Sequence, residues 1–211
     1  MMAYLCLKAE TKTPMARPRT FNEDEVIQRA MVAFWKDGYE GTSVGKLEQA
    51  TGISRISLYN AFGDKTQLFL KALRLYSKSS STYFENEEFV SGGLSAIIGL
   101  FEGTDTQSDD QAPERFGCLM LNTILDLETA GRDAKQIIAD TRERMINGFE
   151  KNMHRAIDSG EMQGVPPTEI RERAEFLVGA LWGGRMAVRL HGDICQARGT
   201  AATVARIVKT W

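Results

Sequence analysis

The stretch Thr42–Lys65, TSVGKLEQATGISRISLYNAFGDK, decides the fold of this chain. It holds two short helix-forming segments, 44–51 and 55–62, and each is followed by a glycine, Gly52 or Gly63. Thr42 or Ser43 can cap the first segment and Ser54 the second, because a hydroxyl oxygen accepts a hydrogen bond from the first free N–H groups of a helix. Two short capped helices joined by a glycine-containing turn are the sequence form of a helix-turn-helix.

The apolar residues of this stretch lie where the two helices would face each other. Leu58 and Phe62 are four residues apart and therefore share one face of the second helix. Leu47 and Ala50 on the first helix, with Ile53 in the turn, complete a small common core. The remaining face of the second helix is left for another partner.

That remaining face carries side chains that suit the edges of DNA bases. They are Arg55, Ile56, Ser57, Tyr59 and Asn60. In the major groove arginine pairs with guanine, asparagine pairs with adenine, and an apolar group contacts the thymine methyl. Segment 55–62 is therefore predicted to be a DNA recognition helix.

Helical periodicity extends through almost the whole chain, so we predict an all-α fold. Asn22 can cap a helix that ends near Gly38, and Asp64 opens a longer one with an apolar stripe over 65–78. A polar surface loop is expected at 103–113. The later expected helices span 114–128, 133–159, 168–191 and a last segment that ends at Trp211.

A serine-rich stretch at 77–82 and the break at 91–93 place the predicted domain boundary after Lys78. We expect an N-terminal extension over 1–14 that packs on nothing, a DNA-binding head over 15–78, and a body over 79–211. The head has ten Lys/Arg against seven Asp/Glu, whereas the body has fourteen against twenty. A basic head on an acidic body suits a module that meets polyphosphate, although chance asymmetry explains the charges as well.

The run GYEGTSVGKLEQATGISRISLYNAFGDKTQLF, residues 38–69, resembles the DNA-binding domain of TetR-family repressors in order and spacing. The resemblance extends over about residues 17–76. It implies about nine helices, with three in a helix-turn-helix head and the rest in a body that dimerises and binds a small ligand. Ile56 departs from the pattern, because many relatives have a small residue or proline there.

The resemblance also implies the roles of individual residues. Thr42 and Ser43 would contact phosphate, Tyr59 and Lys65 would hold the DNA backbone, and four further residues would face bases. The full candidate set is Thr42, Ser43, Ser54, Arg55, Ile56, Ser57, Tyr59, Asn60 and Lys65. Three alternatives stay open: Tyr59 as a partly buried aromatic, Lys65 as a solvated charge, and Arg55 as an ordinary exposed arginine.

Arg17 and Arg19 flank Pro18 ahead of the head, and the proline keeps this arm extended. Such an arm can follow phosphates or enter a minor groove. A basic tail without fixed contacts is the alternative.

The segment 176–192, FLVGALWGGRMAVRLHG, mixes bulky apolar residues with glycines. Each glycine costs a helix roughly 1 kcal/mol relative to alanine, and close approach of another helix would offset that cost. The last helix adds a stripe of small residues, Ala201, Val204, Ala205 and Val208. The resemblance implies that these two helices form a homodimer interface, with packing inside one chain as the alternative.

The candidate effector site is Cys118, Asn122, Trp182 and Arg185. Cys118 lies near a predicted helix start, and the pattern around it resembles TetR-type regulators that answer electrophiles. A small buried hydrophobe is the competing interpretation. Asn122 interrupts an apolar run and needs a hydrogen-bond partner if it is buried. Trp182 and Arg185 can line the same cavity, or Trp182 can simply pack in the core.

Composition narrows the function classes. Three scattered cysteines favour a reducing cytoplasm, and the first residues match neither a signal peptide nor a membrane span. Catalytic motifs such as GxSxG, HExxH and P-loops do not occur, and His154 and His191 lack metal-ligand spacing, so we expect neither an enzyme nor a cofactor or metal. The sequence therefore predicts a transcriptional regulator whose partners are double-stranded DNA, a second copy of itself and a small-molecule effector. A helical scaffold protein is the alternative, and repressor cannot be told from activator.

Overall fold

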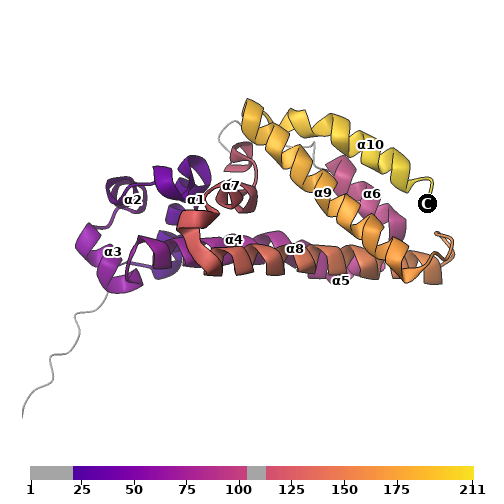
Figure 1. The fold of residues 1–211 in the computed structure, drawn as a ribbon, viewed down its shortest axis with the longest axis horizontal. Helices are drawn as coiled ribbons and strands as arrows, with labels where there is room; N and C mark the ends of the chain where they lie inside the picture. Colours follow the sequence, from indigo (N-terminus) through magenta and orange to yellow (C-terminus); the bar gives the residue numbers. More distant parts are fainter. Residues whose placement is uncertain (1–20, 104–112) are drawn as a thin grey trace, which may run out of the picture.

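The computed structural model describes residues 21–103 and 113–211, and the regular elements in these ranges are helices joined by short turns (Figure 1). The predicted extension 1–14 and the arm with Arg17 and Arg19 lie outside the described residues. The first helices are α1 (Glu23–Gly41), α2 (Val44–Thr51), α3 (Arg55–Phe62), α4 (Lys65–Glu85), α5 (Glu87–Ser91) and α6 (Gly93–Gly103). The later ones are α7 (Leu119–Leu125), α8 (Leu127–Asp158), α9 (Pro167–His191) and α10 (Arg198–Val208), with short 3-10 helices η1 (Pro113–Phe116) and η2 (Ile194–Ala197).

The helices form an elongated molecule with the helix-turn-helix at one end (Figure 1). Helices α4 and α8 run side by side along its length, and α9 and α10 lie together at the other end. Helix α7 sits between α1 and α9. The predicted all-α class with a helix-turn-helix head and a helical body is confirmed.

Two apolar cores hold the described residues together. One lies in the head, around Phe34, Phe69 and Leu73, and it also takes in Cys118 and Met120 from the region of α7. The other lies in the body, where α6, α8, α9 and α10 meet. Head and body therefore share packing through α7, and a shift of α7 is felt in the head core because interiors are close-packed.

Helix α4 continues through the serine-rich stretch that the sequence placed at a boundary. Ser77 and Ser81 are buried against α8, where the Ser77 hydroxyl lies 2.7 Å from the hydroxyl of Thr141. The guanidinium of Arg144 donates to both serines. These small polar residues therefore join two helices, and the expected boundary after Lys78 falls inside α4. How the chain divides into domains stays a prediction.

The structure corrects two further helix expectations. The single helix expected over 114–128 is divided into η1, α7 and the first residues of α8, because Gly117 has a positive φ of 80° and separates η1 from α7. Helices α5 and α6 occupy the region that the sequence analysis expected to be broken, and α6 begins at Gly93, whose φ is 60°. Within the described residues, no helix is both long and apolar enough to cross a bilayer.

Candidate DNA-binding surface and effector cavity

The helix-turn-helix forms with the predicted bounds and caps. The Ser43 hydroxyl accepts a hydrogen bond from the Lys46 amide at 3.2 Å, and the Ser54 hydroxyl accepts one from the Ser57 amide at 3.3 Å. Gly52 ends α2 in the left-handed conformation, with φ 75°. This is the conformation that glycine adopts without strain, so the turn between α2 and α3 is fixed by local sequence.

The inner face of α3 is buried as predicted. Leu58 is 2% exposed and Phe62 4%, and Leu47 of α2 is 1% exposed. With these residues inside, helix α3 is anchored along one side only. Its other side is the outer surface of the head.

That outer side presents the residues expected to face bases. Ile56 is 73% exposed, and Arg55 and Asn60 are exposed beside it. The Arg55 guanidinium lies 5.3 Å from the centre of the Tyr59 ring, and the Arg55 amide donates to Glu48 at 2.6 Å. An exposed isoleucine next to an arginine and an asparagine offers groups that suit base edges in a major groove, and that role stays a prediction.

Lys65 is held at the start of α4 by an aromatic ring. Its ammonium lies 4.4 Å from the centre of the Tyr39 ring, a cation–π distance. The Tyr39 hydroxyl lies 2.8 Å from that of Thr66, which fixes the ring. A lysine positioned in this way at a helix N-terminus suits a phosphate contact, and that role stays a prediction.

Thr42 requires a correction. Its side chain is fully buried, and its hydroxyl donates to the Gly38 carbonyl at 2.6 Å. It therefore cannot offer this hydroxyl to a phosphate in the arrangement described. The cap of α2 is Ser43, which is exposed and remains a candidate for that contact.

A cavity of about 220 Å³ lies in the body, enclosed by residues of α4, α6, α7, α8 and α9 and by Cys118, which caps α7. Cys118, Trp182 and Arg185 all line it, as expected of three of the four candidate effector residues. Tyr76 and Tyr83 of α4 also line it, and the sequence analysis missed them. These two tyrosines are seven residues apart and therefore share one helix face, which is a usable sequence signal. The sequence analysis missed it because it ended this helix at Lys78.

Asn122 does not line this cavity, which corrects the fourth expectation. It is buried, and its amide donates to the carbonyls of Trp35 and Phe116, each at 3.1 Å. The predicted need for a partner is thus met by a link between α7 and α1. A second link lies next to it, because the Tyr39 amide donates to the Asp126 carboxylate at 3.0 Å.

The chemistry of the cavity wall is set by burial. Burial raises the pKa of the Tyr76 hydroxyl well above its usual range; the Cys118 thiol raises it further, and the Arg185 guanidinium lowers it. Tyr76 therefore stays protonated at neutral pH. Its ring meets the ring of Trp35 edge-on, with 4.8 Å between the ring centres. The cavity wall thus contacts helix α1 of the head directly.

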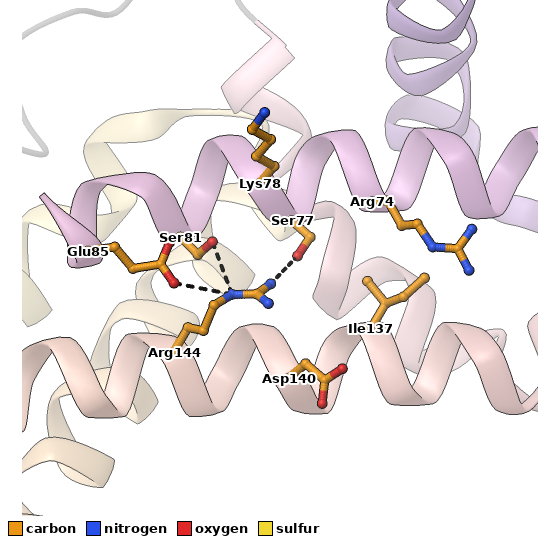
Figure 2. A pocket seen from close by; sticks show the side chains of 8 residues that line it. All are labelled: Arg74, Ser77, Lys78, Ser81, Glu85, Ile137, Asp140 and Arg144. Atoms are coloured by element: carbon orange, nitrogen blue, oxygen red, sulfur yellow. Dashed lines mark hydrogen bonds and ion pairs between the residues drawn. The ribbon is translucent and has the colours of Figure 1, made fainter.

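A larger groove, of about 380 Å³, lies between α4 and α8 (Figure 2). Arg144 crosses it and binds Ser77, Ser81 and, at 3.8 Å, the carboxylate of Glu85. Asp140 adds a second acidic group. Exposed charges are screened by water, and the contacts of Arg144 join α4 to α8 across this groove.

Together, an all-helical fold and an exposed recognition helix define a helix-turn-helix transcriptional regulator. Residues 26–72 match the family described as bacterial regulatory proteins, tetR family. The chain is 28% identical to the HTH-type transcriptional repressor ComR of Escherichia coli (strain K12) over 203 residues, which is 93% of each chain. It is 44% identical to the HTH-type transcriptional repressor AcnR of Corynebacterium glutamicum over 155 residues, covering 72% of this chain and 74% of AcnR.

A solved structure gives the same assignment. A cysteine mutant of the TetR-family regulator CifR, complexed with 26-base-pair double-strand operator DNA, superposes with a TM-score of 0.76 at 27% identity. The match covers 90% of this chain and 98% of CifR. The chain belongs to the TetR family of bacterial transcriptional regulators.

Proposed function

We propose that this protein is a cytoplasmic repressor that binds a near-palindromic operator as a homodimer and leaves it when a small molecule fills the body cavity. The observation that carries the proposal is the surface of α3, where Ile56, Arg55 and Asn60 point outward while Leu58 and Phe62 are buried. ComR and AcnR are named repressors, and CifR was solved on operator DNA. These relatives support repression over activation.

The dimer is proposed from a stripe on α9. Five residues recur at steps of three and four and form what we call the α9 seam: Phe176, Gly179, Gly183, Met186 and Leu190. All five are exposed in the single chain, and Leu190 is 78% exposed. An apolar stripe with this spacing is the pattern by which helices pack on each other, and a copy of the same helix is self-complementary to it.

Release follows from the position of the cavity. Tyr76 lines the cavity and lies on α4, the helix that follows the recognition helix α3. The cavity wall is therefore mechanically connected to α3. A ligand shifts the equilibrium only if it binds the DNA-incompetent arrangement better. A coupling free energy of about 1–3 kcal/mol is sufficient.

The test of this function is binding to the DNA upstream of the protein's own gene. Footprinting should show two half-sites with centres about one helical turn, or a multiple of it, apart. Because several phosphates are contacted, affinity should fall by orders of magnitude between about 50 and 200 mM salt. A helical scaffold would give no footprint, and a single asymmetric site occupied by a monomer would contradict the dimer.

Substituting alanine at two head positions should separate positioning from base reading. We expect Lys65→Ala to weaken binding to all sequences alike, because Lys65 faces the DNA backbone. Arg55→Ala should lose about 1–3 kcal/mol and also relax discrimination at one base position. Binding to a randomised operator library measures both effects. An unchanged base preference in the Arg55 variant would show that this arginine is an ordinary exposed side chain.

Cys118 distinguishes a covalent from a non-covalent effector. Its side chain is 7% exposed and lines the cavity. Buried cysteines with apolar neighbours are generally inert, so we expect a thiol-reactive quinone that enters the cavity to release DNA no faster from wild type than from Cys118→Ser. Release can be followed by fluorescence anisotropy of labelled operator. Quinone-driven release that disappears in the serine variant would identify Cys118 as the sensor.

A further inference from the structure

Among the described residues that line the effector cavity, Arg185 is the one charged side chain. Arg185 lines it from α9, and the other lining residues are neutral. Within residues 21–103 and 113–211, no carboxylate forms an ion pair with Arg185. A cation that is partly removed from water and has no anion beside it costs free energy, and a bound anion offsets that cost.

Most of the other lining residues are apolar or aromatic, and they include Phe84, Met120, Met145 and Trp182. Ser80 and Thr141 add two neutral hydroxyl groups. Aromatic faces and methionine sulfur favour a flat, unsaturated partner. At about 220 Å³ the cavity is smaller than the roughly 300–1,000 Å³ typical of drug-sized ligands, so it suits a molecule with one ring.

A hydroxyl donor, Tyr76, lines the same cavity as Arg185. Tyr76 remains protonated, because burial raises its pKa, and the electrostatic influence of Arg185 reaches it. A guanidinium and a phenolic O–H that line the same cavity can each donate to an oxygen of a carboxylate. Phe84, Met120 and Leu181 also line it and offer apolar contacts, so the two ends of a ligand would be told apart.

We propose that the effector is a single-ring aromatic carboxylic acid, whose carboxylate pairs with Arg185 and whose ring packs on Trp182. This inference rests on the proposed effector cavity and names its ligand class. The groove in Figure 2 is a poor rival site for such an acid. Its cations Arg74 and Lys78 are exposed to water, and Asp140 lies in the same groove.

The test compares acids with their neutral amides by calorimetry on the full chain without DNA. The probes are benzoate, phenylacetate and cinnamate, each paired with its amide. In wild type we expect at least one acid to bind ten-fold or more tightly than its own amide. Arg185→Gln should remove this preference, Arg185→Lys should keep part of it, and the control Arg189→Gln, an exposed arginine outside the cavity wall, should keep it all.

Three outcomes would overturn the inference: no acid of the panel exceeds its amide, the preference survives in Arg185→Gln, or Arg189→Gln removes it as completely. Melting temperatures identify any variant that fails to fold. If Arg185→Gln does not fold, Arg185→Lys is compared with wild type in its place. Because DNA is absent, the result is independent of operator binding. If the protein bound no operator, footprinting would fail but the preference for the acid over its amide would remain. If acids and amides bound equally, the repressor proposal would still stand.

Discussion

Leucine at both glycines of the α9 seam, Gly179→Leu/Gly183→Leu, is expected to make the protein monomeric at micromolar concentration and to lower operator affinity by about 100-fold or more. Two joined heads bind two half-sites with an effective-concentration gain of roughly 10²–10⁴, and a monomer forfeits that gain. Each half-site contact itself stays intact, because the substitutions are far along the chain from α3.

The structural reason lies in the empty space around these positions. In the single chain, a Cβ at Gly179 or Gly183 would meet none of the described atoms within 4 Å. Neither glycine has a positive φ, so a leucine is accommodated in the helix without strain. In a dimer built on the seam, the two backbones approach where the glycines stand, and leucine side chains would hold them apart.

The measurement is sedimentation velocity together with operator titration. Gly99→Leu is the matched control, because Gly99 is also an exposed helical glycine with nothing within 4 Å of its Cβ position, but it lies on α6. This control should remain a dimer. If the double variant also remained a dimer and became more stable by about 1 kcal/mol per replaced glycine, the seam would be a solvent-facing surface.

The head was predictable because its signals are local. Caps at Ser43 and Ser54, the stop at Gly52, and the apolar pair Leu58 and Phe62 all act within a few residues of one another. Each of these interactions forms in the structure as predicted. Thr42 was misassigned because two adjacent hydroxyl residues are equivalent in sequence, and only the packing of α1 on α2 decides which of them is buried.

The body was harder to predict because its decisive contacts are distant in sequence. Asn122 and Trp35 are 87 residues apart, as are Asp126 and Tyr39, yet both pairs form hydrogen bonds that fasten α7 to α1. Periodicity indicates that Asn122 is buried but not which carbonyl it meets. The same holds for Ser77, whose partner Thr141 turns an apparent linker into a helix contact.

Alanine at Gly148 is expected to destabilise the body. Helices α4 and α8 are in close contact there, and an added Cβ would lie 2.4 Å from the Phe84 carbonyl oxygen and 2.8 Å from the Phe84 Cβ. Backbone atoms cannot rotate away, so the two helices must separate. Alanine gains about 1 kcal/mol of helix propensity, but we expect separation of two packed helices to cost more than this gain.

We expect Gly148→Ala to lower the free energy of unfolding by about 1–3 kcal/mol, the range found for overpacked cores. In a chain of this size each kcal/mol corresponds to roughly 2–4 °C in melting temperature. Thermal unfolding at one fixed protomer concentration measures the change, because dimerisation makes Tm concentration-dependent. Gly99→Ala is the control, because a Cβ at Gly99 meets no described atom within 4 Å. The same gain in helix propensity should leave this variant as stable as wild type or more so.

Equal melting temperatures for the two alanine variants would mean that α4 and α8 tolerate separation at Phe84. In that case Phe84 and Tyr83, which line the effector cavity, would move independently of α8. A ligand could then not shift α4 through the contact between Phe84 and Gly148.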